Sequence, residues 1–476
     1  MILPLPADLA RLLRELPVLR RAYLVGGCVR DAILGRPLKD FDVEVFGASY
    51  EALAEALRPW GRTDFVGRSF GVIKLSLGNA VHDFSIPRRD SKVGPGHRGF
   101  DIHLDPHITP PEAAARRDFT LNALMWDPRS GEVLDFFGGR DDIERRILRH
   151  IGEAFRDDPL RVLRGMQLAG RFHLTGAPET LACCRELVGT FHELAFERVR
   201  DEWFKWAASS TVPSAGLRWI EAAGWLSHFP ELDALRGVPQ EPEWHPEGDV
   251  FQHTCHALDA LPDLPAWRDA DEPTRIVVSL AVLTHDFGKA TCTHTVLRDG
   301  RSRIVSPGHE NDSARLAAAF LERLRIPRAI AERVVPLVLQ HMAHFQEPGE
   351  RAVRRLARRL APETVEHLCL VMTADAFGRP PRPRQTPSAV EAIRRIANRL
   401  DLARSAPQPL LLGRHLLALG LSPGKEIGRW THAAFEAQLD GRFHDLNGAH
   451  AWLAGHPDFP PAAAARAAET TSEERG

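Results

Sequence analysis

The stretch GGCVRDAILGRPLKDFDVEVFG (residues 26–47) decides how the N-terminal part of this chain folds. It begins where the short apolar run AYLVG (22–26) ends, and that run predicts a buried strand followed by a Gly-Gly turn. Residues 29–35 predict a helix. FDVEVFG (41–47) alternates apolar and acidic residues, which is typical of a strand with two different faces. The stretch therefore predicts a strand–turn–helix–strand unit.

The residues that follow extend this pattern. GVIKLSLG (71–78) and AVHDFSI (80–86) predict two more strands joined by a Gly-Asn turn. Residues 90–111 contain Gly, Pro and His without periodicity, and they predict a long loop of the kind that is often functional. We therefore expect a small mixed sheet with helices, an α/β head, over residues 1–145.

Acidic residues gather on one predicted strand. Positions two apart on a strand share a face, so Asp40 and Asp42 converge, and Asp83 could add a third carboxylate. A divalent cation would relieve their repulsion, and Mg²⁺ prefers carboxylate oxygens. Such a pair alone is more often a solvated strand face. The glycines before the helix, including Gly27, would let a phosphate approach the backbone.

Composition excludes several classes of protein. The chain has 476 residues, of which 44% are hydrophobic and 26% charged, with a formal net charge of -2. No run approaches the ~18 apolar residues of a membrane helix, and the N-terminus lacks the pattern of a signal peptide. Six cysteines form no C-x-x-C pair, which indicates neither a disulfide scaffold nor a zinc finger. We expect a cytoplasmic protein with no membrane partner.

Strand signals nearly vanish after about residue 142, and the pattern of apolar residues beyond it predicts helices of 10 to 20 residues. Residues 239–249 and 377–387 are rich in proline and predict breaks between domains. The expected organisation is a head (1–145), a helical neck and body (146–238), a helical domain (245–378), a helical tail (388–458) and a disordered C-terminus (459–476).

Five segments, taken in order, resemble the nucleotidyltransferase head that tRNA CCA-adding enzymes share with bacterial poly(A) polymerases. Residues 26–47 are similar to its signature, and 87–101 to its flexible loop. RRDFTLNALMWDP (116–128) is similar to the ribose-recognising motif, 134–143 to the next motif, and 155–172 to the motif that selects the nucleobase. The resemblance covers about residues 20–230.

The resemblance implies a site. Asp40 and Asp42 would hold two Mg²⁺ ions, which activate the RNA 3′-hydroxyl and support the triphosphate. Gly27 and Arg30 would contact phosphates. Arg117 and Asp118 would bind phosphate and the ribose 2′-hydroxyl, with Asn122 beside them. The implied partners are tRNA, CTP and ATP.

The nucleobase motif can also be read from its chemistry. Asp158 and Arg161 are expected three apart on one helix face, which Arg164 extends. Asp accepts from an exocyclic amine and Arg donates to a ring acceptor, an order that cytosine and adenine share and that uracil and guanine reverse. An ordinary salt bridge within the helix is the alternative. The family usually has Glu where this chain has Asp157, and we expect no consequence of that change.

A second group of candidates lies in the helical domain. A buried His-Asp pair needs a partner or a metal, and His285-Asp286 directly follows the apolar run IVVSLAVLT. With His253 upstream and Asp375 downstream, the pattern resembles the HD phosphohydrolase superfamily, which implies a divalent metal of uncertain identity. His309 and His341 are further candidate ligands.

Together these resemblances imply a CCA-adding enzyme whose HD domain has phosphatase or 2′,3′-cyclic phosphodiesterase activity. A poly(A) polymerase or an A-adding enzyme of the same family is one alternative. An RNA phosphohydrolase whose head only docks tRNA is another, and a metal-free, RNA-binding HD segment is a third. The sequence leaves open whether the protein is a monomer or a dimer.

Residues 351–404 hold twelve arginines and no lysine against five acidic residues. This excess predicts either a strip that follows tRNA phosphates or a solvated face in an arginine-rich chain.

Overall fold

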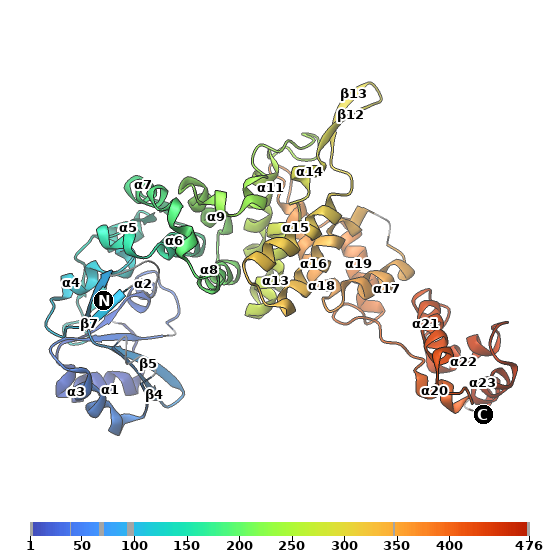
Figure 1. Ribbon diagram of the computed structural model, residues 1–476, viewed down its shortest axis with the longest axis horizontal. Coiled ribbons are helices and arrows are strands. Elements are labelled where there is room, and N and C mark those ends of the chain that lie inside the picture. The colour runs from blue at the N-terminus through green and yellow to red at the C-terminus, as the bar shows by residue number, and fades with distance from the viewer. Residues whose placement is uncertain (1–2, 39, 66–70, 93–99, 346–347, 474–476) are drawn as a thin grey trace. The chain divides into compact units, whose positions relative to one another are not determined.

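The computed structural model describes residues 3–38, 40–65, 71–92, 100–345 and 348–473. These divide into two compact units, residues 1–230 and 231–476 (Figure 1). None of the helices in the described ranges is long and apolar enough to cross a membrane.

The first unit begins with a sheet in the order β3-β4-β5-β2-β1-β8-β9. Its strands are β1 (Ala22–Val25), β2 (Asp42–Val45), β3 (Arg62–Asp64), β4 (Val72–Leu77), β5 (Ala80–Ser85), β8 (Met125–Trp126) and β9 (Val133–Leu134). β2 is antiparallel to β1 and parallel to β5, so the sheet is mixed. This confirms the predicted α/β head, including the strands expected at 22–26, 41–47, 71–78 and 80–86.

The helices of the head are α1 (Ala7–Glu15), α2 (Gly27–Ile33), α3 (Tyr50–Leu57), α4 (Pro110–Ala115) and α5 (Gly139–Glu144). Side chains from α1, α3 and the sheet form one apolar core, in which Leu9, Leu53 and Val43 are fully buried. Gly26 joins β1 to α2 with a φ of 71°, in the left-handed region that favours glycine. A side chain there would also meet the Arg117 guanidinium at 3.0 Å.

The loop expected at 90–111 differs from the structure. β6 (Arg88–Lys92) and β7 (Phe100–Leu104) pair as a separate two-stranded ribbon. The irregular composition between them hid the pairing, because the strand segments are only five residues long each. Residues 105–109 are irregular, as expected, and Pro110 begins α4, whereas residues 93–99 of the expected loop lie outside the described residues.

The rest of the first unit is helical, as predicted. It contains α6 (Leu160–Phe172), α7 (Pro178–Glu186), α8 (Phe196–Ser209) and α9 (Pro213–Ala222), with a short parallel pair, β10 (Ile147–Leu148) and β11 (Thr175–Gly176). α6 packs closely on α9, because Gly165 leaves room for Trp219; a Cβ at Gly165 would lie 2.4 Å from that indole. The Trp219 indole N–H donates to the Val162 carbonyl and fixes the contact.

The second unit is mostly helical. After α10 (Pro230–Asp233), its helices are α11 (Val250–Ala260), α12 (Pro265–Arg268), α13 (Glu272–Thr284), α14 (Lys289–Cys292), α15 (His309–Arg323), α16 (Arg328–Gln340), α17 (Glu350–Leu360), α18 (Val365–Phe377) and α19 (Ser388–Arg399). α13 is buried along its apolar run and packs on α11, α16 and α18. A hairpin of β12 (His294–Arg298) and β13 (Arg301–Val305) projects from these helices (Figure 1).

The C-terminal segment 459–476 is expected to be disordered, and that expectation is wrong for residues 461–473. After α20 (Gly413–Ala418), α21 (Lys425–Leu439) and α22 (Leu446–Ala454), residues 461–473 form α23 (Pro461–Glu473). Ala463 and Ala467, four residues apart, are buried with Phe459 in the core of the tail. Low complexity concealed this helix, although alanine has the highest helix propensity.

Candidate functional site

A polar cavity of about 470 Å³ lies in the first unit between the sheet and the first neck helices. Nine of the residues singled out in the sequence line it: Gly27, Arg30, Asp42, Arg117, Asp118, Asn122, Asp158, Arg161 and Arg164. Gly26, Arg88, Arg116 and Arg198 complete the lining. The tertiary fold thus brings together residues that are up to 172 positions apart in the sequence, Gly26 and Arg198.

The predicted carboxylates meet at the start of β2. Asp42 is the first residue of β2, and Asp83 lies directly beside it on the parallel strand β5. Displacement of water by the protein and the nearby Asp83 carboxylate raise the pKa of the Asp42 carboxyl. Asp40 is expected on the same strand face, but β2 begins only at Asp42, so Asp40 lies before the strand, where it is exposed and adds to that rise. Asp83 is already paired with Lys74, whose Nζ lies 2.8 Å from Oδ2.

Glu44, which the sequence analysis did not single out, lies two residues beyond Asp42 on the same face of β2. Its carboxylate is fully buried and accepts from Arg116 at 2.9 Å and from Arg117 at 3.1 Å. Burial alone would raise the pKa of Glu44, but the Arg117 and Arg116 guanidinium groups lower it. Glu44 therefore holds two arginines at the wall of the cavity. The alternation of acidic and apolar residues in 41–47 is the sequence signal that could have identified Glu44.

Asp118 and Asn122 form the floor of the cavity. Asp118 Oδ1 accepts from the Asn122 amide at 2.9 Å, and Oδ2 accepts from Arg164 Nε at 2.7 Å. Asn122 Oδ1 accepts from Arg30 at 2.6 Å. Burial opposes ionisation of Asp118, but Arg164 and the hydrogen bond from Asn122 outweigh it and lower the pKa. The network places fixed cations around a cavity large enough for a nucleotide's polar groups.

Asp158 and Arg161 differ from the expected helical pair. Asp158 is extended, with φ −124° and ψ 98°, and lies before α6, whereas Arg161 lies within it. They form no salt bridge with each other within the described residues. Asp158 pairs instead with Arg198 of α8, whose Nη2 lies 2.7 Å from Oδ2. The proline at 159, which N-caps α6, explains why the helix begins after Asp158.

Arg161 is held by backbone carbonyls. It donates to Ala154 O at 2.8 Å, to Arg116 O at 2.8 Å and, at 3.4 Å, to Arg117 O. A guanidinium has five N–H donors, so donors remain for a ligand. Arg198 was missed because no sequence spacing links α8 to the start of α6.

The second predicted group gathers in the second unit. His253 of α11, His285 and Asp286 after α13, and Asp375 of α18 are all buried. His253 Nε2 lies 3.1 Å from Asp375 Oδ1, and His285 Nε2 lies 3.3 Å from Asp286 Oδ2. His309 and His341 complete the cluster, with His309 Nε2 3.3 Å from Asp286 Oδ1 and 3.2 Å from His341 Nε2.

Three of these imidazoles use Nδ1 in the same way. Nδ1 of His285, His309 and His341 lies 2.6 to 2.7 Å from the carbonyls of Val282, Ser306 and Val338. A carbonyl can only accept, so each Nδ1 donates its hydrogen and each Nε2 is left as a lone-pair donor toward the centre. This is the arrangement in which histidines bind metals.

The six candidate ligands form two adjacent triads, in each of which the ligand atoms lie within 4.8 Å of one another: His253, His285 and Asp375, and Asp286, His309 and His341. His245, Glu247 and His253 form a third such group. His253 Nε2 and His285 Nε2 are buried without a hydrogen-bond partner in the described part of the chain. Burying such groups unsatisfied is costly. The donor set of imidazoles and carboxylates therefore fits a divalent cation.

Three charged side chains contact the candidate metal ligands. Lys289 Nζ lies 2.8 Å from Asp286 Oδ2, and Arg379 Nη2 lies 2.7 Å from Asp375 Oδ1. Glu247 accepts from Nδ1 of His253 at 2.7 Å. Burial would raise the pKa of Glu247, but hydrogen bonds from His245 and His253 lower it to about 2. Sequence reasoning passed over these three supporting residues, although Glu247 and Lys289 stand next to the two motifs.

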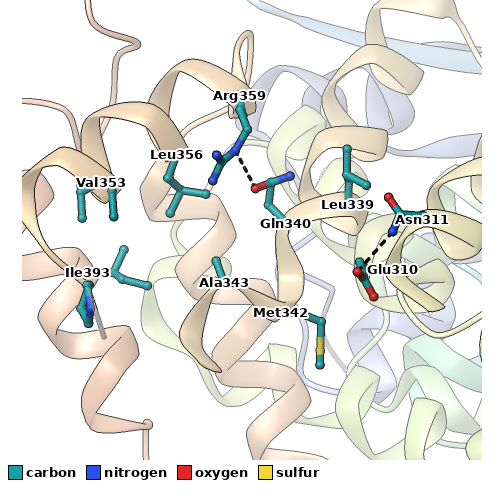
Figure 2. Close-up of a pocket in the computed structure, with 12 residues that line it drawn as sticks. Glu310, Asn311, Leu339, Gln340, Met342, Ala343, Val353, Leu356, Arg359 and Ile393 are labelled. Carbon is teal, nitrogen blue, oxygen red and sulfur yellow. Dashed lines mark hydrogen bonds between the residues drawn. The ribbon is translucent and has the colours of Figure 1, made fainter. Parts of the chain in front are cut away.

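The centre opens into a cavity of about 610 Å³, and a smaller hollow of about 350 Å³ lies beside it. Met342 lines both. In the smaller hollow, Arg359 donates to Gln340 and Asn311 donates to Glu310, so these polar groups are paired among themselves (Figure 2). The smaller hollow contains none of the metal-ligand triads found among the described residues.

The arginine-rich stretch 351–404 is mostly neutralised by partners. Ten of its twelve arginines make an ion pair or side-chain hydrogen bond: Arg351, Arg354, Arg355, Arg358, Arg359, Arg379, Arg382, Arg384, Arg394 and Arg399. Several partners, such as Glu436 and Asp440, lie outside the stretch. The structure therefore favours a salt-bridged face over a continuous strip for phosphates.

Two family models match the chain: a poly A polymerase head domain over residues 22–149 and an HD domain over residues 251–379. A multifunctional CCA protein of Xanthomonas campestris is 38% identical over 373 residues, which are 75% of this chain and 85% of that protein. The chain belongs to the multifunctional CCA protein family. Another member, from Nitrosococcus oceani, is 35% identical and covers 84% of this chain and 93% of its own length.

Solved structures have the same fold as this family member. The CCA-adding enzyme of Bacillus stearothermophilus, in complex with CTP, superposes with a TM-score of 0.64 over 99% of both chains at 19% identity. The Thermotoga maritima CCA-adding enzyme, complexed with tRNA, gives 0.56 over 93% of both chains at 18% identity. The family and fold make this chain a nucleotidyltransferase that also has an HD domain.

Proposed function

We propose that this enzyme adds CMP, CMP and AMP in turn to the 3′ end of tRNA, with CTP and ATP as donors, in the cytoplasm, where these substrates occur. The observation that carries the proposal is the cavity that unites the strand carboxylate Asp42 with the ribose motif and the nucleobase motif. The names of its relatives support the same activity.

The head suits a divalent cation, and we assign Mg²⁺. Asp40 and Asp42 offer carboxylate oxygens, and the crowding that raises the Asp42 pKa is what a cation relieves. When bound, such cations supply Lewis acidity at the attacking 3′-hydroxyl and at the triphosphate. We assign Asp83 a supporting place, because its carboxylate is already bonded to Lys74.

The chain's own residues bind and select the nucleotide. Arg30 and Arg117 offer positive charge to the phosphates beside Gly27, and Asp118 accepts from the ribose 2′-hydroxyl, with Asn122 and Arg164 holding it in place. Asp158 accepts from the exocyclic amine of C or A, and Arg161 donates to the adjacent ring acceptor. Arg198 fixes Asp158 before the nucleotide arrives.

For the second unit we propose hydrolysis of phosphate esters at RNA ends, as a phosphatase or a 2′,3′-cyclic phosphodiesterase. The buried triads of imidazole and carboxylate atoms support it. A divalent metal held by His253, His285, Asp286 and Asp375, with His309 and His341, would supply Lewis acidity toward a phosphate and water. Lys289 and Arg379 hold the carboxylates ionised and oriented.

Incubating the protein with tRNA that lacks its 3′ end, giving single nucleoside triphosphates and mixtures, and sequencing the products tests the first activity. We expect C, C and A in that order, with no addition from UTP or GTP. Runs of A alone would instead identify a poly(A) polymerase, and a single A on tRNA already ending in CC would identify an A-adding enzyme. No addition with any triphosphate would leave a phosphohydrolase with a docking head. Light scattering with and without tRNA separates a monomer from a dimer.

A further inference from the structure

Trp244 is the exposed tryptophan of this protein. All ten tryptophans are described, and the other nine are buried or partly buried, whereas Trp244 is 55% exposed. It lines the cavity of about 610 Å³ whose depth holds Asp286, His309 and Asp375. An indole at the wall of a cavity that opens onto candidate metal ligands offers a flat apolar surface to whatever binds there.

The turn that presents Trp244 is fixed from two sides. The backbone N–H groups of Trp244 and His245 both donate to the Glu241 carbonyl. The Glu241 carboxylate accepts from the Ile304 N–H at 2.9 Å and from Arg303 at 2.9 Å, which ties the turn to β13. Arg382 lies over the indole at 5.4 Å from its centroid. The indole is therefore held in place before a ligand arrives.

Arg298, at the end of β12, lines the same cavity. Its guanidinium makes no ion pair or side-chain hydrogen bond within the described part of the chain. Lys289 and Arg379, by contrast, are engaged by Asp286 and Asp375. Among the described cations that line this cavity, Arg298 is therefore the one whose charge is available to a phosphate other than the one at the metal ligands.

We propose that Trp244 and Arg298 make this cavity a site for the 3′-terminal nucleotide of an RNA. The terminal base stacks on Trp244, and Arg298 pairs with the phosphodiester on the 5′ side of that nucleotide. Stacking tolerates any base, which suits a site that acts on RNA ends of different sequence. This inference rests on the proposed phosphohydrolase function and names two residues, Trp244 and Arg298, that bind the terminal nucleotide of its substrate.

For a 2′,3′-cyclic end, the chemistry balances with water alone. The oxygen of water bonds to phosphorus as one of the two ribose P–O bonds breaks. The departing ribose oxygen takes a proton, and the product is a phosphomonoester on the other ribose oxygen. The terminal base takes no part in bond making, so its contact with Trp244 acts on binding.

The test compares two cyclic phosphates that differ only in the base: adenosine 2′,3′-cyclic phosphate and methyl riboside 2′,3′-cyclic phosphate. We expect Trp244→Ala to raise KM for the adenosine substrate about 10- to 100-fold, the range that loss of one base stack predicts. KM for the base-free substrate and kcat for both should stay near wild type. Trp244→Phe, which keeps an aromatic face, should restore most of the binding.

Two further variants complete the design. Leu339→Ala removes an exposed apolar side chain from the neighbouring hollow and should change neither KM (Figure 2). Arg298→Ala should weaken a dinucleotide that ends in a 2′,3′-cyclic phosphate and spare the mononucleotide. Calorimetric titration of adenosine 3′-phosphate and ribose 3-phosphate into wild type and Trp244→Ala gives a measure of binding that does not depend on turnover.

The proposal is overturned if Trp244→Ala changes KM for both cyclic phosphates equally, or for neither. Failure of the underlying function has a different signature. Wild type would then hydrolyse neither substrate with Mg²⁺, Mn²⁺, Ni²⁺ or Co²⁺. In that case calorimetry still tests the nucleotide site. Tighter binding of adenosine 3′-phosphate than of ribose 3-phosphate by wild type, with the difference lost in Trp244→Ala, supports the site. Equal binding of the two ligands by wild type refutes it.

Discussion

Asp158 and Arg161 are each anchored by the protein, and by different partners. Arg198 holds the Asp158 carboxylate, and the carbonyls of Ala154 and Arg116 hold the Arg161 guanidinium. A pair bonded to itself would have to break to admit a base. Because these two groups are fixed separately, their remaining lone pairs and N–H donors are free to pair with a base edge.

Arg161→Ala should therefore alter which nucleotide is added. A lost charge-assisted hydrogen bond costs about 1.5–3 kcal/mol, or roughly 10- to 150-fold in kcat/KM for CTP and ATP. UTP and GTP, which pair poorly with this edge, should lose much less. The measurement is kcat/KM for all four triphosphates on one tRNA acceptor.

Arg198→Ala is the companion variant, since it releases Asp158 without removing either pairing group. We expect a smaller loss, again greater for CTP and ATP. Equal proportional losses for all four triphosphates in Arg161→Ala would show that the arginine only supports the fold.

At the scale of elements, one face of β2 carries both a residue of the cavity and a buried ion-pairing residue. Asp42 faces the cavity at the end of the strand, and Glu44, one pleat further, is buried against Arg116 and Arg117. The opposite face presents Val43 and Val45 to the core. The alternation of apolar and acidic residues along β2 thus packs one face of the strand in the core and positions the arginines on the other.

Glu44→Gln should destabilise the protein by about 3 kcal/mol, because it removes one partner of a buried ion pair. The pKa of Glu44 is lowered from its ordinary 4.5 in the folded protein. Its stabilising contribution is therefore complete above pH 4.5 and is lost as the pH falls through the folded pKa. Thermal unfolding of wild type and variant at pH 7 and toward pH 3.5 checks this.

The gap in unfolding temperature should narrow at the acidic end. A gap that is the same at both pH values, or that widens in acid, would contradict a stabilising role of the Glu44 carboxylate. Nucleotide affinity at pH 7 should also fall, since Arg117 loses its anchor.

The terminal helix α23 offers a second test at this scale. Ala467 is fully buried against the tail, whereas Ala465, on the same helix, is exposed. Ala467→Asp should release α23, because an unpaired carboxylate would be buried, and limited proteolysis should then cut within residues 456–473 at a much higher rate. Ala465→Asp is the matched control and should remain resistant. Equal cleavage of both variants and wild type would mean that the helix is not packed.

At the scale of the molecule, the two centres belong to separate compact units, one within residues 1–230 and the other within 231–476. Asp42 lines the cavity of the first and His285 is buried at the centre of the second. The two centres share no residue, so a substitution in one centre should abolish its activity without affecting the activity of the other.

Asp42→Asn should lower nucleotide addition at least about 100-fold, because one cation ligand is lost, and leave phosphohydrolase activity unchanged. His285→Ala should do the reverse and should also lower the metal retained after dialysis. Each variant is the control for the other, with addition to tRNA and phosphate release measured on the same preparations. Loss of both activities in either variant would contradict independent centres.

The sequence alone determined the elements whose signal is local. The alternation in 41–47 and the apolar runs in 22–26 and 71–86 predicted strands, because side-chain burial on a sheet has a period of two. The candidate residues in both centres were also found from the sequence, since ordered motifs and the His-Asp pair after an apolar helix are visible without coordinates. Of these, nine line the cavity of the first unit, and six form the buried cluster of the second unit, where four of them also line its cavity.

Only the tertiary structure decided the partners. No spacing along the chain could show that Asp158 bonds to Arg198, that Glu44 holds Arg117, or that Lys289 and Glu247 support the buried histidines. The tertiary structure also showed that arginines of 351–404 form salt bridges with acidic residues distant in the sequence, and that the alanine-rich C-terminal segment is a packed helix. The physical reason is common to all of these: charge pairing and burial depend on which surfaces meet in space, whereas local patterns report only the face that each element presents.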